Sequence, residues 1–221
     1  KFFLNMYSKS YYSNYHNLSL LLLYKNFFKL IDYNFGCNPL SRAPNVCKKE
    51  EKIQREYEMR LVEETRRAQE AEALIRQGWA KAASIVSHLD GLRDATPNPD
   101  PEKAPYDKYI PINQQRIKRI RKTLAKVGLR EDLNSALSGL AAGTKMLVLN
   151  EFWCGDGAQI LPVHEAMEAA SGGRLEVRVL MRDAHLDVMD LFLTNGGRSI
   201  PKTVLLTADQ EVLGSWGPRP A

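Results

Sequence analysis

The stretch Lys145-Met-Leu-Val-Leu-Asn-Glu-Phe-Trp-Cys-Gly-Asp-Gly157 decides the fold of this 221-residue chain. Its first eight residues form a compact apolar run of strand length, and residues 158–170 carry apolar side chains at helical spacing. Cys154 therefore lies at the junction between a predicted strand and a predicted helix. The free N–H groups and positive dipole end of a helix stabilise a thiolate, and Trp153 would shield one side of the sulfur. We interpret Cys154 as a reactive cysteine rather than an inert one.

The residues around this junction predict an α/β domain. Downstream, the pattern indicates a β-branched strand, a helix that stops at an Asn-Gly-Gly turn, and two short strands, at residues 175–181, 186–194, 203–207 and 211–216. Upstream, residues 113–127 and 130–140 have the spacing of two helices. The predicted order from residue 145 onward is β-α-β-α-β-β.

The helix predicted at residues 113–127 carries six basic side chains and no acidic one. Two interpretations are open: it binds phosphate groups, or it docks through Ile117 and Ile120 and exposes its basic face to solvent. We favour the second, because no aromatic side chain that could stack on a base lies among the charges. A nucleic acid is therefore not an expected partner.

The first 95 residues contain two regions of different composition. Residues 1–47 hold six of the nine tyrosines, five of the seven phenylalanines and most of the net positive charge, and we interpret them as a doubtful or disordered segment. Residues 48–95 have the apolar spacing and the i,i+4 Glu–Arg pairs of a helical extension, with Gly78 as a possible division. The Pro-rich residues 96–105 then form a stiff linker.

The composition excludes several classes of protein. Three cysteines are too few for a disulfide framework or a multi-cysteine zinc module, and the histidines have no metal-binding spacing with any cysteine, so we expect no metal. No run of eighteen apolar residues occurs, so we expect no transmembrane helix. No small-x-small cleavage site closely follows the short apolar run at 18–24, and we therefore expect a cytoplasmic protein.

Four blocks of this sequence together resemble the thioredoxin superfamily. They are Glu151-Phe-Trp-Cys-Gly-Asp156, Arg182-Asp183, Leu193-Thr-Asn-Gly-Gly-Arg-Ser-Ile-Pro201 and Trp216-Gly-Pro-Arg-Pro220. More narrowly, they look like a bacterial thioredoxin-like branch with a single-cysteine Trp-Cys-Gly-Asp motif. The resemblance covers residues 106–221 and implies a thioredoxin-like α/β fold, a central mixed sheet flanked by helices.

The resemblance also implies a C-terminal helix that covers one face of the sheet. The sequence stops after Pro218-Arg-Pro220 without that helix, which we interpret as a truncation. We therefore expect the sheet face that bears part of residues 204–206 to be exposed or to be covered by an N-terminal helix.

The resemblance implies roles for three residues of the motif. Cys154 would be the attacking cysteine, and Trp153 would lie beside it. Asp156 would either accept a hydrogen bond or a proton from the thiol, or be an acid in the first helical turn that the dipole favours. The negative charge of Asp156 would also oppose formation of the thiolate.

A second set of residues would bind the substrate. Pro201 would be the cis-proline that faces the sulfur and, with Ile200, aligns an extended substrate backbone. Arg198 and Ser199 would lie at the same edge of the sheet. Arg198 would bind a carboxylate or a glutathione-like anion, or would instead brace the loop in a network with Arg182 and Asp183.

Two departures from the thioredoxin pattern shape the function that we expect. Gly157 stands where the resolving cysteine would be, and Val148 stands where thioredoxins keep a buried acid, so the internal dithiol cycle is absent. The first hypothesis is a monothiol, thiol-disulfide oxidoreductase-like protein that exchanges with protein or small-molecule disulfides. An external thiol such as glutathione would be its co-substrate, with no other cofactor. The alternative is a redox-inactive module that binds peptides. Only the first requires an accessible and acidic Cys154.

Overall fold

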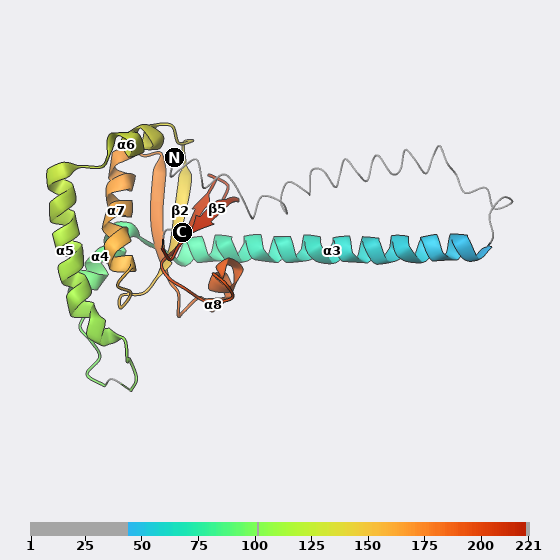
Figure 1. Cartoon of the computed structure of the whole chain (residues 1–221), viewed down its shortest axis with the longest axis horizontal. Helices are drawn as coiled ribbons and strands as arrows, with labels where there is room; N and C mark the ends of the chain where they lie inside the picture. Colours follow the sequence, from blue (N-terminus) through green and yellow to red (C-terminus); the bar gives the residue numbers. More distant parts are fainter. Residues whose placement is uncertain (1–43, 101, 220–221) are drawn as a thin grey trace. The chain divides into compact units, whose positions relative to one another are not determined.

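The computed structural model describes residues 44–100 and 102–219 (Figure 1). Our interpretation of residues 1–47 therefore falls, up to position 43, outside the described residues. The chain divides into two compact units after Glu70. Helix α3, Pro44–Lys81, therefore has residues in both units. The unit that holds the sheet begins at Ala71, inside the stretch that we interpret as a helical extension.

A five-stranded mixed sheet forms the centre of the domain. Its strands lie in the order β1-β3-β2-β4-β5, with bounds Ala83–Ser84 for β1, Thr144–Asn150 for β2, Leu175–Met181 for β3, Lys202–Leu206 for β4 and Val212–Trp216 for β5. Strand β2 pairs in parallel with β3 and antiparallel with β4, and β1 and β5 pair antiparallel at the two edges. Six of the seven β2 residues are buried, as expected for a central strand that is covered on both faces.

Helices cover both faces of this sheet. On one side lie α4 (Ile85–Asp94), α5 (Ile110–Val127), α6 (Glu131–Ser138) and α7 (Gly157–Ala170), and Figure 1 shows α5 and α7 side by side. On the other side lie the last turns of α3 and the short helix α8 (Leu186–Met189). The predicted α/β fold, with a mixed sheet and a preceding N-terminal helix, is confirmed.

The N-terminal helix covers the sheet face for which we expected either exposure or such a cover. Val204 and Leu206 are completely buried, and they share an apolar cluster with Ile75 and Trp79 of α3. The opposite face is less completely covered at β4. There Leu205 is half-buried and lines an apolar cavity of about 670 Å³ beside α7 and β5.

Two predicted boundaries are wrong. The N-terminal helix does not divide at Gly78, where a Cβ would lie 3.1 Å from Leu180, so the glycine allows close packing against the sheet. The break falls at strand β1, and Ser84 caps α4 by accepting a hydrogen bond from the Ser87 N–H. The helix predicted at residues 186–194 is also shorter, because α8 gives way to a 3-10 turn, Asp190–Phe192.

Candidate functional site

Cys154 lies in the loop between β2 and α7, as predicted. Its Sγ accepts a hydrogen bond from the Gly157 N–H at 3.3 Å, at the first residue of α7. The thiol also donates toward the Ile200 carbonyl at 3.5 Å, and the peptide bond between Ile200 and Pro201 is cis. The structure therefore places Cys154, Ile200 and Pro201 together. The cysteine is only 6% exposed.

Burial changes the electrostatics that we expected from the helix N-terminus. It raises the pKa of the Cys154 thiol above its ordinary value, and the charge of Asp156 raises the pKa further. Backbone N–H groups of Gly157 and Asp156 and the charge of Arg182 act in the opposite direction, but their effect is smaller. The lowered pKa expected at this junction is therefore outweighed by desolvation, and the neutral thiol predominates at pH 7.

Trp153 is half-buried and contacts two side chains from distant segments. The Tyr106 ring centroid lies 4.8 Å from the Trp153 ring, and the Arg182 guanidinium lies 5.2 Å from the same ring. Arg182 also pairs with Asp183 and donates to the Arg198 carbonyl at 2.9 Å. Trp153 thus holds a cation and an aromatic ring beside the loop that carries Cys154.

The Asp156 side chain forms an ion pair with Arg219 instead of a hydrogen bond with the Cys154 thiol. Its Oδ2 accepts from Arg219 Nε at 2.8 Å. Asp156 also precedes the first residue of α7, but its side chain does not cap the helix. This geometry fits the interpretation of Asp156 as an acid at the start of a helix better than its interpretation as a partner of the thiol.

Arg198 is also engaged by a carboxylate. It forms two hydrogen bonds with Asp190, at 2.6 and 2.8 Å, and this partner lowers the pKa of the Asp190 carboxyl. Together with the contact from Arg182 to the Arg198 carbonyl, this arrangement is a network that braces the loop. Ser199, the next residue, is half-buried.

The position of the missing resolving cysteine is sterically filled. A Cβ on Gly157 would lie 1.9 Å from Asn150 Oδ1 and 2.9 Å from Asn150 Nδ2. Asn150, at the end of β2, is buried, donates to the Glu151 carbonyl at 2.9 Å, and has its Nδ2 3.5 Å from His88 Nε2. The sequence shows a glycine at position 157, but it does not show that the Asn150 side chain leaves no room for a larger residue there.

Sequence reasoning missed two residues of the basic helix that contact the Cys154 loop. Asn113 is fully buried in α5, and its Nδ2 donates to the Phe152 carbonyl at 3.0 Å. Arg116 Nη1 in turn donates to Asn113 Oδ1 at 2.9 Å. A Cβ on Gly155 would lie 2.7 Å from that same Nη1, so the guanidinium lies against the residue that follows Cys154. The signal available in the sequence was the separation of Asn113 and Arg116 by three residues, which places both side chains on one face of a helix.

Lys202, directly after Pro201, was also missed. It is 6% exposed, and its Nζ donates to Thr194 Oγ1 at 2.6 Å and to the Gly217 carbonyl at 3.0 Å. Burial lowers the pKa of this lysine. Lys202 therefore ties together the two loops that flank Pro201.

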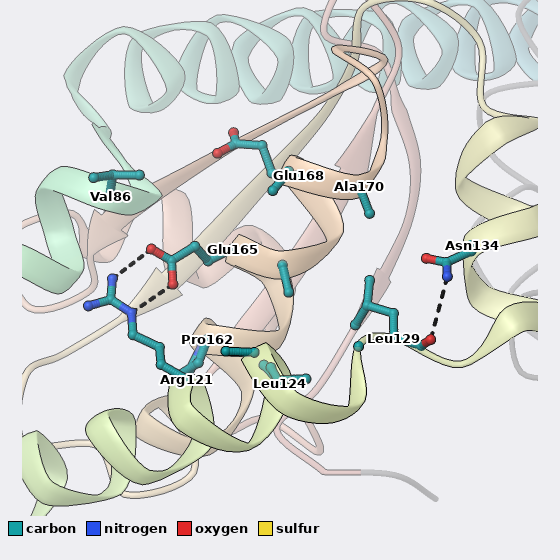
Figure 2. A pocket seen from close by; sticks show the side chains of 13 residues that line it. Val86, Arg121, Leu124, Leu129, Asn134, Pro162, Glu165, Glu168 and Ala170 are labelled. Atoms are coloured by element: carbon teal, nitrogen blue, oxygen red, sulfur yellow. Dashed lines mark hydrogen bonds and ion pairs between the residues drawn. The ribbon is translucent and has the colours of Figure 1, made fainter.

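Two of the cavities formed by the described residues are not lined by Cys154. One has a volume of about 730 Å³ and lies between α5 and α7 (Figure 2). Beside it, Arg121 donates to both carboxylate oxygens of Glu165, at 2.7 and 2.6 Å. The other is the apolar cavity beside Leu205, near the Asp156–Arg219 pair.

Among residues 44–100 and 102–219, no cluster of three or more His, Cys, Asp or Glu side chains could hold a metal ion. Within the same residues, no helix is long and apolar enough to cross a membrane.

A cysteine at the end of a central parallel strand, before a helix and opposite an Ile-Pro loop, defines a thioredoxin-like protein. A protein-family model described as thioredoxin matches residues 102–221, more than half of the chain, and the chain belongs to this thioredoxin family. No curated protein matches the chain significantly.

Two solved structures are similar to this chain. One is a protein of unknown function from Pseudomonas aeruginosa, with 23% identity and a TM-score of 0.45; the match covers 49% of this chain and 65% of that one. The other is an HIV epitope scaffold, with 22% identity and a TM-score of 0.44 over 59% of this chain and 77% of the scaffold. The chain thus spans just under two thirds of the Pseudomonas protein.

Proposed function

We propose that this domain is a monothiol protein of thiol–disulfide exchange, with Cys154 as its reacting group. The observation that supports this proposal best is the place of Cys154 Sγ, between the Gly157 N–H and the Ile200 carbonyl that precedes Pro201. A thiolate formed there receives a hydrogen bond from the start of a helix, and an extended substrate can lie along the Ile200–Pro201 segment.

The exchange has two steps. In the first, the Cys154 thiolate attacks one sulfur of a substrate disulfide, a new S–S bond forms to Cys154, and the other sulfur leaves as a thiolate that takes up a proton. Position 157 offers no second thiol, so an external thiol such as glutathione attacks the mixed disulfide and releases Cys154. A bacterial cytoplasm, which is rich in small thiols, would supply this resolver.

The raised pKa of Cys154 gives this exchange a particular character. Little thiolate is present at neutral pH, but a thiolate of high pKa is a strong nucleophile and a poor leaving group. Attack of an external thiol on the mixed disulfide therefore more often expels the other thiol and leaves Cys154 capped, so release of Cys154 is slow and needs excess thiol. We propose slow exchange at neutral pH and a long-lived mixed disulfide rather than rapid turnover.

The second candidate function is a redox-inactive module that binds extended peptides. The small exposed fraction of Cys154 and its raised pKa favour this candidate, because the thiol is neither accessible nor acidic as the monothiol hypothesis first required. The monothiol function is therefore proposed only in the slow form described above. The two functions would use the same loop at Ile200 and Pro201. They differ in whether Cys154 forms a covalent bond.

The pH dependence of Cys154 alkylation tests the state of the thiol. In a variant with Cys37→Ser and Cys47→Ser, which leaves one thiol, we expect the rate with iodoacetamide to rise with pH through an apparent pKa above the reference of about 8.5. Mass spectrometry of the modified peptide measures the rate, and Cys154→Ser is the blank. A rate that is already constant above about pH 7 would contradict a buried, protonated thiol.

Incubation of the same variant with glutathione disulfide separates the two functions. The monothiol function predicts a mixed disulfide on Cys154, formed faster at alkaline pH and removed by excess glutathione. If alkylation of Cys154 proceeds but no mixed disulfide forms at any pH, the monothiol proposal fails and the peptide-binding module remains.

A further inference from the structure

Arg116 is distinguished from the other arginines near Cys154 by its partners. Arg182 pairs with Asp183, Arg198 with Asp190, and Arg219 with Asp156. Within the described part of the chain, no carboxylate lies within ion-pair distance of Arg116, and the side chain that accepts its hydrogen bond is the neutral amide of Asn113. Arg116 therefore brings to this loop a positive charge that no carboxylate of the described residues neutralises.

The position of Arg116 is fixed by the same loop. Asn113 is fully buried and donates to the Phe152 carbonyl, so its Oδ1 holds the Arg116 guanidinium in place from behind. Gly155 leaves room for that guanidinium, because a Cβ there would lie 2.7 Å from Nη1. A guanidinium held in this way loses little conformational freedom when it binds a ligand.

The chemistry of this arrangement selects an anion. A guanidinium has five N–H donors, and the one hydrogen bond to Asn113 leaves others for a ligand. Half-buried Arg116 is shielded from solvent on one side, and planar carboxylates fit the guanidinium in a bidentate way. Because Gly155 directly follows Cys154, an anion bound to Arg116 would lie beside the loop that carries the thiol.

We infer that Arg116, positioned by Asn113, forms an anion-binding subsite next to Cys154. It would select small disulfides and thiols that carry a carboxylate close to the reacting sulfur. Arg198, which sequence reasoning offered for this role, is committed to Asp190. The assignment of the substrate class rests on the proposed thiol–disulfide function, whereas the subsite itself can be tested with any reagent that reacts with Cys154.

Two alkylating reagents that differ in charge test the subsite. In the variant that retains only Cys154, the rate constants for iodoacetate and iodoacetamide are measured at one alkaline pH and low ionic strength. Their ratio cancels any change in the amount of thiolate, because both reagents react with the same species. We expect Arg116→Gln to lower the iodoacetate-to-iodoacetamide ratio by roughly threefold to tenfold, as for loss of one nearby charge.

Two further variants serve as controls. Arg116→Lys keeps the charge and should retain most of the ratio. Arg119→Gln removes an exposed arginine from the next turn of α5 and should leave the ratio unchanged. Far-UV circular dichroism and urea unfolding verify that each variant is folded.

The outcomes separate the subsite from the proposed function. An unchanged ratio in Arg116→Gln, or an equal decrease in Arg119→Gln, would overturn the subsite, since the second result reflects only the general field of the helix. A ratio that depends on Arg116 in a protein that forms no mixed disulfide with glutathione disulfide would support the subsite and overturn the redox function. An unchanged ratio in a protein that does form the mixed disulfide would support the redox function and overturn the subsite.

Discussion

Acidification from pH 7 to about pH 4 is expected to lower the free energy of unfolding by roughly 3 kcal/mol for each of two buried histidines. Burial lowers the pKa of both His88 and His164 from 6.5 to about 4. His88 packs against Phe152, with ring centroids 4.9 Å apart, and His164 Nδ1 has no hydrogen-bond partner in the described structure. Protonation would place a charge in surroundings that cannot solvate it.

The direction of this effect follows from proton binding. In the unfolded chain these histidines take up protons near pH 6.5, whereas in the folded chain they resist until about pH 4. Their contribution to stability is therefore fully present above pH 6.5 and is lost as the pH falls toward 4. Burial raises the pKa of Glu151 and Glu168, and these carboxyls act in the opposite direction as the pH falls.

Urea unfolding at several pH values measures this loss. His88→Phe and His164→Leu are compared with the wild-type protein, and each should reduce the difference in free energy of unfolding between pH 7 and pH 4 by roughly 3 kcal/mol. The comparison within each variant cancels the cost of repacking the new side chain. An equal difference in the wild-type protein and both variants would show that other groups carry the acid sensitivity.

The central part of the fold could be predicted from the sequence because its signals are local. The apolar run from Lys145 and the valines of β3 fix two buried strands, and their observed bounds differ from the predicted ones by at most two residues. The two-residue strand β1 could not be predicted. It exists only because Ala83 and Ser84 pair with β3, which is nearly a hundred residues away in the chain.

The candidate site was predictable in its position but not in its electrostatics. The motif placed Cys154 at the start of a helix and near Ile200 and Pro201, and the structure has them there. The place of Cys154 at the start of a helix predicted a lowered pKa for its thiol. Burial of the thiol in the folded protein raises this pKa instead. The partner of Arg198 and the contact of Arg116 with the loop also depend on tertiary packing, which spacing alone does not reveal.

Replacement of Gly157 by cysteine is expected to destabilise the domain rather than restore an internal dithiol. The new Cβ would lie 1.9 Å from Asn150 Oδ1 and 2.7 Å from its Cγ, closer than real atoms approach. Asn150 is 1% exposed and would have to give up its hydrogen bond to the Glu151 carbonyl to move away. Overpacking of this kind costs about 1–3 kcal/mol and occasionally more, and the lost hydrogen bond adds about 1 kcal/mol.

Gly214→Cys is the matched control for Gly157→Cys. Gly214 lies in β5, and no atom outside its immediate neighbours lies within 4 Å of a Cβ built there. Urea unfolding under reducing conditions should show the full loss in Gly157→Cys and little change in Gly214→Cys. Equal stability of the two variants would show that Asn150 moves aside without cost.

Removal of the Asn150 side chain should reverse much of the loss caused by the new cysteine. We expect Asn150→Ala with Gly157→Cys to be more stable than the sum of the single substitutions predicts, because the first creates the space that the second needs. Cys154 and the new thiol would then lie three residues apart at the start of α7, the spacing of a Cys-X-X-Cys disulfide. Oxidation should remove two hydrogens from the mass of the double variant that also carries Cys37→Ser and Cys47→Ser. If Gly157→Cys alone forms this disulfide as readily as the double variant, Asn150 does not prevent a thiol at position 157 from pairing with Cys154.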